Sequence, residues 1–379
     1  MKVEKQLIKK RIFRKEKENI KMQHKLNKEL LQHLQEGTVI PAHPLALKEN
    51  LSLDEKRQRL LTRYYIAAGA GGVAVGVHTT QFEIRKPEIN LLESVLKLAA
   101  EEVEKAKLNR PFIKIAGICG PTTQALKEAE LAVKYGYHLG LLSMGGLTDY
   151  SEDDILQRTK DVATTIPVFG FYLQPSVGGR IFSYHFWSEF VKIPNVLAVK
   201  IAAFNRYQTI DVVRAICNSG RSNEIALYTG NDDNIVADLL TTYRFSVNEE
   251  IVEKRFVGGL LGHWAVWTDS AVKLLTEIKN CIANNYIGTE NILSKGIEVT
   301  DTNAAFFDVA NGFKGCISGI HEVLYRQGLF EGIWCLDKHE QLSPGQAEEI
   351  SRVYAAYRSY NDYAFVKEFL TNDKENNLV

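Results

Sequence analysis

The chain has 379 residues but few cysteines, and those it has are not clustered. The five are scattered, odd in number, and lack Cys-x-x-Cys spacing. Zinc clusters need closely spaced cysteines and disulfide frameworks need paired ones, so the sequence argues against both. Scattered cysteines fit a reducing compartment, and we therefore expect a cytoplasmic protein.

Long apolar runs and an excess of one charge are also missing. No stretch approaches the ~20 apolar residues that a membrane span needs, and the charged N-terminus has no apolar segment typical of a secretory signal. Lys plus Arg and Asp plus Glu number 46 each, so there is no global basic field for nucleic acid. We therefore expect neither a membrane nor a nucleic-acid partner.

The composition that remains is ordinary for a globular protein, except at the start of the chain. Residues 1–36 are dense in Lys, Arg, Gln and Glu, and Leu30, Leu31 and Leu34 form a short helical stripe before Gly37. One interpretation is a basic extension that binds an anionic partner. The favoured one is a solvated helical extension that packs through its leucines.

From Thr38 onward, strand-like apolar runs alternate with helical patterns. Eight strands, each followed by a helix, predict the α/β class and a (β/α)8 TIM barrel, with a doubly wound sheet as the alternative because periodicity cannot prove closure. The predicted strands are 39–42, 72–77, 112–118, 138–143, 167–172, 196–201, 224–229 and 257–261. The predicted helices include 54–68, 86–106, 122–134, 153–164, 184–191 and 207–217.

No strand follows the eighth. Residues from about 269 read as further helices, with amphipathic segments at 303–328 and 343–363 and a polar end, 371–379, that we expect to fray. The predicted organisation is an N-terminal basic helical extension (1–36), the barrel (37–268) and a C-terminal helical region (269–379).

Lys200 lies within an apolar run, 195–203, that reads as a buried strand. A buried ammonium must be paired or desolvated, and desolvation lowers its pKa. A lysine that is neutral near pH 7 is a nucleophile, which predicts Schiff-base chemistry on a carbonyl. Lys114 is a poorer candidate because it lies in the middle of its predicted strand.

Active sites of TIM barrels gather at the C-terminal ends of the strands. The polar residues expected there are His43, His78, Thr79, Thr80, Cys119, Ser143, Tyr172, Lys200, Gly230, Asp232 and His263. Strand alternation places Lys200 on the inward face, and the same argument for Val168, Gly170 and Tyr172 predicts a tyrosine that points inward beside it. A phenol there would relay protons during imine formation.

This order of residues resembles the dihydrodipicolinate synthase / N-acetylneuraminate lyase family, over roughly residues 37–360. The matching motifs are His78-Thr79-Thr80, Tyr172-Leu173-Gln174-Pro175, Lys200, and Gly230-Asn231-Asp232-Asp233. The resemblance implies a (β/α)8 barrel, a Schiff-base lysine and no metal or other cofactor. By position it implies that Lys200 forms the imine, Tyr172 relays protons, Thr79 and Thr80 hold a substrate carboxylate, and Gly230 borders the substrate.

The sequence also departs from the family pattern. His78 replaces the first glycine of Gly-Thr-Thr-Gly-Glu and Phe82 replaces its glutamate. Val177 stands where the synthases place an arginine, with Arg180 slightly beyond, and His43-Pro44 replaces Thr-Pro. The lysine-pathway synthase activity is therefore not expected, and an aldolase or dehydratase with another substrate fits better.

Each motif also has a plainer interpretation. Lys200 could serve a structural ion pair, Tyr172 could fill the barrel mouth, and the two threonines could cap a loop. The glycine-rich 69–74 has the shape of a dinucleotide motif, but it follows a helix and opens a strand, so a helix C-cap is favoured. Trp264, Trp267, Phe306 and Phe307 are expected in the core.

Taken together, the sequence predicts a class I lyase that acts on a 2-oxo acid or a sugar-derived aldehyde or ketone. Lys200, Tyr172 and Thr79 are the expected catalytic residues, and Thr80, His78, His43, Gly230, Asp232 and His263 are expected to bind substrate. The alternatives are a non-catalytic barrel that binds a sugar acid, and a metal-dependent hydrolase that uses the histidines and Asp232. The resemblance further implies a homo-oligomer, a dimer or a tetramer.

Overall fold

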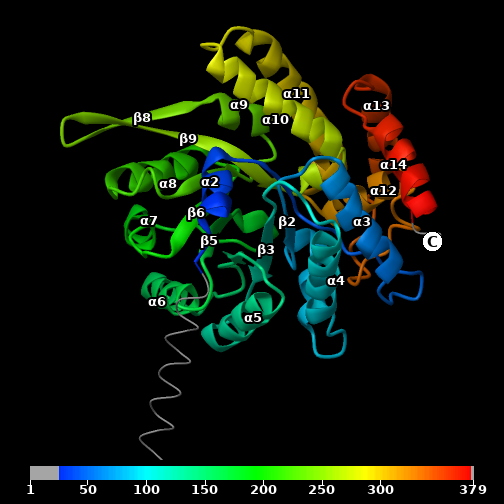
Figure 1. Ribbon diagram of the computed structural model, residues 1–379, viewed down its shortest axis with the longest axis horizontal. Coiled ribbons are helices and arrows are strands. Elements are labelled where there is room, and N and C mark those ends of the chain that lie inside the picture. Colours follow the sequence, from blue (N-terminus) through cyan, green and yellow to red (C-terminus); the bar gives the residue numbers. More distant parts are fainter. Residues whose placement is uncertain (1–24, 377–379) are drawn as a thin grey trace, which may run out of the picture.

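The computed structural model describes residues 25–376, with side chains as far as Asp373, and its centre is a barrel of eight parallel strands (Figure 1). The pairing order is β1-β9-β7-β6-β5-β4-β3-β2. The ring closes between its ends, where the Ala42 and Ala74 backbones bridge in parallel and the His43 N–H donates to the Ala74 carbonyl at 2.8 Å. The TIM barrel is thus confirmed and the open doubly wound sheet is excluded. The strands are β1 (Val39–Pro41), β2 (Gly72–Val75), β3 (Ile113–Ile118), β4 (Leu139–Leu142), β5 (Val168–Leu173), β6 (Val196–Ala202), β7 (Ala226–Thr229) and β9 (Glu250–Leu261).

Helices surround the ring, and most of them agree with the predicted bounds to within two residues. The exception is the helix predicted from Lys86, which begins at Leu92. Lys86 precedes a proline and has an extended backbone (ψ 136°), as residues before proline usually do. These helices are α3 (Glu55–Ala67), α4 (Leu92–Lys105), α5 (Thr122–Lys134), α6 (Glu152–Ala163), α7 (Tyr184–Phe190), α8 (Arg206–Asn218), α9 (Ile235–Leu240) and α10 (Thr268–Ala283).

The glycine-rich segment that follows α3 is a helix end. Gly69 has a φ of +85° directly after the last turn of α3, and β2 begins at Gly72. The prediction of a C-cap rather than a dinucleotide motif is confirmed.

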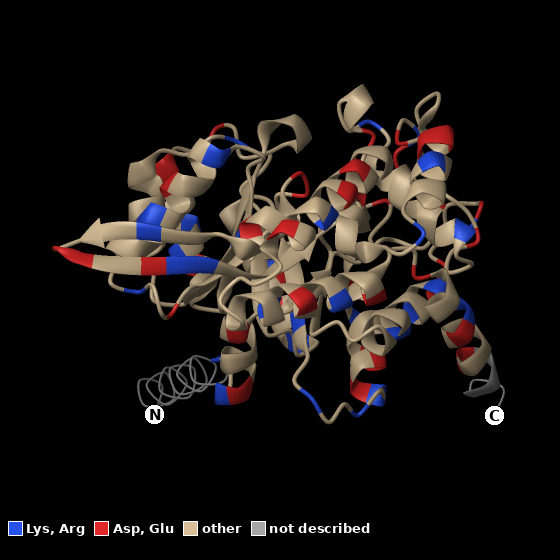
Figure 2. Ribbon diagram, turned by 90° about the horizontal axis from the view of Figure 1, so that it is seen from above, with Lys and Arg blue, Asp and Glu red and all other residues tan. Residues whose placement is uncertain are grey.

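A hairpin that the sequence analysis did not predict extends from the barrel. Strand β8 (Thr242–Val247) pairs antiparallel with the first half of β9, and Asn248 and Glu249 at the turn both have positive φ, as a tight hairpin turn requires. Strand β9 therefore begins at Glu250, but its pairing within the barrel begins at Phe256, one residue before the predicted start at 257. Figure 1 shows this arm passing along α8 and extending beyond it, and Figure 2 shows acidic and basic residues along its ribbon.

The C-terminal addition packs along one side of the barrel (Figure 1). The segment predicted at 343–363 contains one helix, Gln346–Ala356, and a further helix begins at its last residue, Tyr363. The polar end expected to fray is helical as far as Asn376. Among the described residues, none of the helices combines the length and apolar character that crossing a bilayer requires. The added helices are α11 (Thr289–Phe306), α12 (Cys316–Arg326), α13 (Gln346–Ala356) and α14 (Tyr363–Asn376).

Two apolar cores determine which end of the barrel is open to ligands. One fills the space between the strands and the helices, and the other lies inside the barrel, with Phe169, Phe171 and Tyr228 as its largest side chains. Leu34 of α2 (Lys28–Glu36) belongs to the inner core, and the Leu34 carbonyl accepts a hydrogen bond from the Tyr228 hydroxyl at 2.9 Å. Helix α2 therefore closes the N-terminal end of the barrel, so access is from the C-terminal end. The rest of the basic extension, residues 1–24, lies outside the described residues.

Candidate active site

Lys200 lies at the C-terminal end of β6 and lines a pocket inside the barrel. The pocket has an empty volume of about 600 Å³, including its open mouth. Lys200 is paired with Phe171 on β5 and with Tyr228 on β7, and it is 8% exposed. The predicted inward orientation of this lysine agrees with the structure, because its neighbours Ala198 and Ala202 belong to the inner core.

Gly230 creates the space that Lys200 occupies. A Cβ atom at position 230 would lie 2.4 Å from Lys200 Cε and 2.9 Å from the Ala202 Cβ, closer than real side chains approach. The Gly230 N–H donates to the Ile201 carbonyl at 2.7 Å, which fixes the backbone of Gly230 against β6. Gly230 thus borders the lysine, and its predicted contact with the substrate stays a prediction.

The Lys200 ammonium is desolvated without a close counter-charge. Its Nζ lies 4.5 Å from the centre of the Phe171 ring, and among the described residues no carboxylate lies within 4.0 Å of it and no hydrogen bond ties it. Burial lowers the pKa of Lys200 from 10.5 to about 8, and the charge of Asp232 opposes this shift. The neutral amine is therefore accessible near physiological pH.

Asp232 is the titratable partner of Lys200 across the pocket. It is 6% exposed, and its Oδ1 accepts the backbone N–H of His263 at 3.2 Å. Burial raises the pKa of Asp232 from 3.8 to about 7, against the opposing charge of Lys200. A carboxyl whose pKa is raised so far can exchange a proton in neutral solution, which makes Asp232 a candidate general acid–base.

A network on α9 holds the loop that carries Asp232. Asp238 is fully buried and accepts hydrogen bonds from the Thr229 hydroxyl at 2.8 Å and the Asn231 side-chain amide at 2.9 Å. Asp238 also pairs with Arg206 of α8 at 2.5 Å. The Asn231 side-chain oxygen in turn accepts the Phe204 N–H at 3.0 Å, so one network positions both the Asp232 loop and the end of β6.

The short 3-10 helix after β2, His78–Thr80, meets the pocket through His78 and Thr79. Burial and the charge of Lys200 lower the pKa of His78 to about 4, so this imidazole is neutral. Thr80 is fully buried and does not line the pocket; its hydroxyl donates to the His43 carbonyl at 2.6 Å and accepts the N–H groups of Gly76 and Val77. Thr80 thus secures the turn after β2, which corrects its expected role in binding substrate.

The predicted orientation of Tyr172 is wrong. Val168, Gly170 and Tyr172 share a face as predicted, but that face is turned toward the helices. Phe171 points inward and faces Lys200 in place of the tyrosine. The Tyr172 ring lies outside the strands, 4.9 Å from Trp187 of α7, and its hydroxyl accepts the Phe182 N–H at 3.5 Å. The phenol is therefore in the outer core, away from the lysine.

His43 is also structural. It is fully buried, with Nδ1 2.8 Å from the Pro44 carbonyl oxygen and Nε2 2.9 Å from the Thr62 hydroxyl. Its ring packs edge-on against Tyr65 of α3, and burial lowers its pKa to about 4. His43 does not line the Lys200 pocket, which corrects its expected role in binding substrate.

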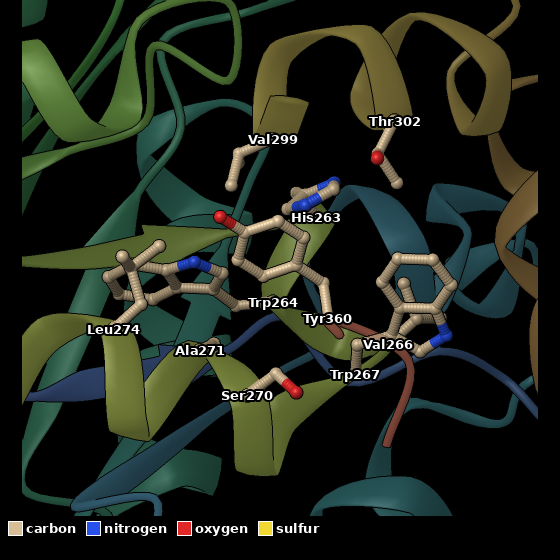
Figure 3. A pocket seen from close by; sticks show the side chains of 10 residues that line it. All are labelled: His263, Trp264, Val266, Trp267, Ser270, Ala271, Leu274, Val299, Thr302 and Tyr360. Atoms are coloured by element: carbon tan, nitrogen blue, oxygen red, sulfur yellow. The ribbon is translucent and has the colours of Figure 1, made fainter. Parts of the chain in front are cut away.

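His263 reaches the Lys200 site only through its backbone. Figure 3 shows its ring in a neighbouring small pocket with Trp264, Trp267 and Tyr360. The ring stacks on Phe306, and its Nδ1 lies 3.4 Å from the Asn303 side-chain nitrogen. The predicted side-chain contact with substrate is therefore wrong, although the His263 N–H holds Asp232.

Sequence reasoning missed the aromatic lining of the pocket. Phe204 and Phe313 both have positive φ, of 51° and 68°, and their rings meet edge-on at 5.9 Å. Such a backbone is strained for a bulky residue and is often found at functional sites. Phe307, which was expected in the core, also lines the pocket, as does Cys316. Backbone strain leaves no signal in a single sequence, so these residues could not have been found there.

The residues considered for a metal site do not come together. His43, His78 and His263 lie in three different environments, and the described part of the chain has no group of three His, Cys, Asp or Glu side chains that could hold a metal ion. The arrangement at Lys200 consists instead of an amine, a carboxyl group and a neutral imidazole, within walls that are mostly apolar.

Comparison with solved structures gives the wider context. No protein-family model and no curated protein matches the sequence. N-acetylneuraminate lyase from Fusobacterium nucleatum has a TM-score of 0.66 at 16% identity, over 86% of this chain and 99% of that one. Dihydrodipicolinate synthase from Oceanobacillus iheyensis has a TM-score of 0.68 at 15% identity, over 87% and 99%. CdNal from Clostridium difficile, solved in complex with mannosamine, has 0.65 at 16%, over 85% and 99%.

At 15–16% identity, the similarity between this chain and these structures is a similarity of fold. The resemblance inferred from Lys200 and its neighbouring motifs is confirmed at that level, and the chain has the barrel fold of the dihydrodipicolinate synthase and N-acetylneuraminate lyase family, with a sequence that differs widely from its solved members.

Proposed function

We propose that the protein is a class I lyase, an aldolase or a dehydratase, in which Lys200 forms a Schiff base with a small carbonyl substrate. The observation that carries this proposal is a desolvated lysine at the open end of a barrel, with a pKa lowered by burial and a protonatable carboxyl group across the pocket. The fold supports it, since one of the similar lyase structures, from Fusobacterium nucleatum, is a complex with pyruvate.

The proposed chemistry begins with the neutral amine of Lys200 and the protonated carboxyl of Asp232. The Nζ lone pair attacks the carbonyl carbon and forms a C–N bond, while the carbonyl oxygen takes the proton of Asp232. The hydroxyl of this carbinolamine then takes a proton from the nitrogen and leaves as water. The products are an iminium, the Asp232 carboxylate and one water, so protons and charge balance.

The iminium then acts as an electron sink. A carbon–carbon bond next to it can break or form, or water can leave from the β carbon, and hydrolysis frees the product. Asp232 takes the role of proton relay that the sequence assigned to Tyr172, because Asp232 lines the pocket and the phenol does not. Phe171 covers the lysine on the side of β5 and excludes water.

Reductive trapping tests this proposal. The full chain is incubated with a panel of 2-oxo acids and neutral aldehydes and ketones, reduced with borohydride, and digested for mass spectrometry. We expect a reduced adduct at Lys200 with at least one class of carbonyl compound. In Lys200→Met, we expect no adduct on the peptide that contains position 200. Lys114→Met is the matched control, because Lys114 is also a strand lysine but donates to the Tyr135 carbonyl at the other end of the barrel. Absence of an adduct at Lys200 across the whole panel would refute the proposal.

A further inference from the structure

We infer that the carbonyl substrate of this pocket is an uncharged aldehyde or ketone rather than a 2-oxo acid, because Asp232 already supplies the negative charge that balances the iminium. This inference rests on the proposed imine at Lys200 and narrows its substrate class. It departs from the expectation that Thr79 and Thr80 hold a substrate carboxylate.

The two threonine hydroxyls have no proton left for a carboxylate. Thr79 Oγ1 donates to the Ala42 carbonyl at 2.8 Å, and Thr80 Oγ1 donates to the His43 carbonyl at 2.6 Å. A hydroxyl has one proton, so the hydroxyl of Thr79, the threonine that lines the pocket, presents only lone pairs to a ligand. A carboxylate oxygen placed against those lone pairs would be repelled.

No second cation faces the pocket. Lys200 is the only lysine or arginine among the described residues that line it. Arg180, the nearest arginine after β5 in the sequence, is held elsewhere, since its Nη1 donates to the Tyr150 carbonyl at 2.8 Å and lies 3.4 Å from the Leu147 carbonyl. Val177 takes a place in the lining instead, and His78 is neutral because burial lowers its pKa.

The charge balance of the imine then selects the substrate. With a neutral carbonyl, the iminium and the Asp232 carboxylate sum to zero inside the pocket. With a 2-oxo acid, the same step leaves a net charge of −1 among the rings of Phe171, Phe204, Phe307 and Phe313. Burying an unbalanced charge in such surroundings is strongly unfavourable, and more so without a guanidinium to pair with it.

The experiment compares two carbonyl compounds of nearly equal size that differ in charge, pyruvate and pyruvamide. For each compound, mass spectrometry measures the rate at which the reduced adduct forms at Lys200. This rate is divided by the rate at which the same compound forms a reduced adduct with free methylamine. We expect the corrected rate for pyruvamide to exceed that for pyruvate at least 10-fold.

Asp232→Asn tests the cause of this preference. The variant keeps an oxygen that can accept the His263 N–H but removes the charge, so the ratio of pyruvamide to pyruvate should fall at least 10-fold. Asp233→Asn is the matched control, because it removes the same charge from the adjacent residue, which does not line the Lys200 pocket. Thermal unfolding of both variants shows that the fold is retained.

The outcomes separate the two proposals. A wild-type preference for pyruvate, or a ratio that Asp232→Asn leaves unchanged, overturns the inference while the Schiff base at Lys200 stands. If neither compound nor any other carbonyl in the panel forms an adduct, the proposed function itself fails.

Discussion

At the scale of single residues, the site depends on what lies next to one nitrogen atom. In the proposed reaction Lys200 is the nucleophile, because the Phe171 ring and the barrel wall remove water from it without supplying a carboxylate in contact. Asp232 is near enough for its charge to act on Lys200 but forms no ion pair with it within 4.0 Å. A direct contact would hold the lysine charged and suppress its nucleophilicity.

The pH dependence of adduct formation follows from these two groups. Neutral Lys200 becomes more abundant as pH rises toward about 8, and protonated Asp232 becomes less abundant as pH rises through about 7. The trapping rate should therefore be bell-shaped, with its maximum between about pH 7 and 8, and the two limbs belong to the pair rather than to either residue. Trapping rates from pH 5 to 10 measure this profile.

Asp232→Asn tests whether the alkaline limb requires a titrating carboxyl at position 232. In that variant the rate should be lower at its maximum and should no longer fall above pH 8. A profile that keeps its alkaline limb would contradict the role of Asp232 as the acid. A wild-type rate that still rises above pH 10 would contradict the lowered pKa of Lys200.

At the scale of elements, the strands were predictable but the faces of one strand were not. Helix α5 begins and ends at the predicted residues, and Lys200 points inward as alternation requires, because apolar periodicity records burial directly. On β5 the alternation also holds, but Phe169 and Phe171 occupy the inner face and Tyr172 the outer one. Both faces of this strand are buried and apolar, so alternation alone does not tell which of them points inward.

The site residues also divide into those that the sequence could predict and those that it could not. Lys200, Gly230 and Asp232 were recognisable as residues of the pocket because they lie at the ends of their strands or just after them. His43 and His263 also follow strand ends, but their rings are taken up by Thr62 and Phe306, partners distant in sequence. The aromatic lining that Phe313 contributes comes from an added segment whose placement only the fold reveals.

Asp238 should act on the site as a positioning residue. It holds Thr229, Asn231 and Arg206 together, so Asp238→Asn should displace the loop that carries Asp232. We expect the trapping rate to fall about 10-fold and the alkaline limb of the pH profile to shift, with a loss of about 1–3 kcal/mol in unfolding free energy because buried donors are left unpaired.

The control for this prediction is Asp211→Asn, which removes the exposed ion pair with Arg214 on the same helix as Arg206. Exposed pairs contribute little, so neither rate nor stability should change appreciably. If Asp238→Asn lowered stability and left the pH profile of trapping unaltered, its role would be structural only.

At the scale of the whole molecule, the barrel is closed at one end and partly covered at the other. Helix α2 places Leu34 in the inner core at the N-terminal end, while Phe313 and Cys316 from the C-terminal addition line the pocket at the opposite end. The addition is tied down in part by the Leu336 N–H, which donates to the Gln81 side chain at 2.6 Å, next to His78–Thr80. The helices beyond the barrel therefore help to form the pocket.

Asp362 is the buried carboxyl that joins this addition to the barrel helices, and it should make their docking depend on pH. It accepts the Tyr64 hydroxyl of α3 and the Gln327 side-chain amide, both at 2.5 Å, and burial raises its pKa from 3.8 to about 6. Because the folded value lies above the unfolded one, the stability that this group contributes is fully present below about pH 4 and is lost as pH rises through about 6.

Asp362→Asn should therefore destabilise the protein more at pH 5 than at pH 7.5. The amide cannot accept hydrogen bonds from both donors, which costs about 1–3 kcal/mol at either pH, and the difference between the two pH values should be about 1 kcal/mol. Urea unfolding of both proteins at the two pH values measures it. Asp301→Asn is the control: its ion pair with Arg352 lowers the pKa of that carboxyl below 3.8, so it stays ionised at both pH values and its loss should have the same effect at each. Equal destabilisation by Asp362→Asn at both pH values would mean that this carboxyl titrates normally, and the C-terminal helices would then dock independently of pH.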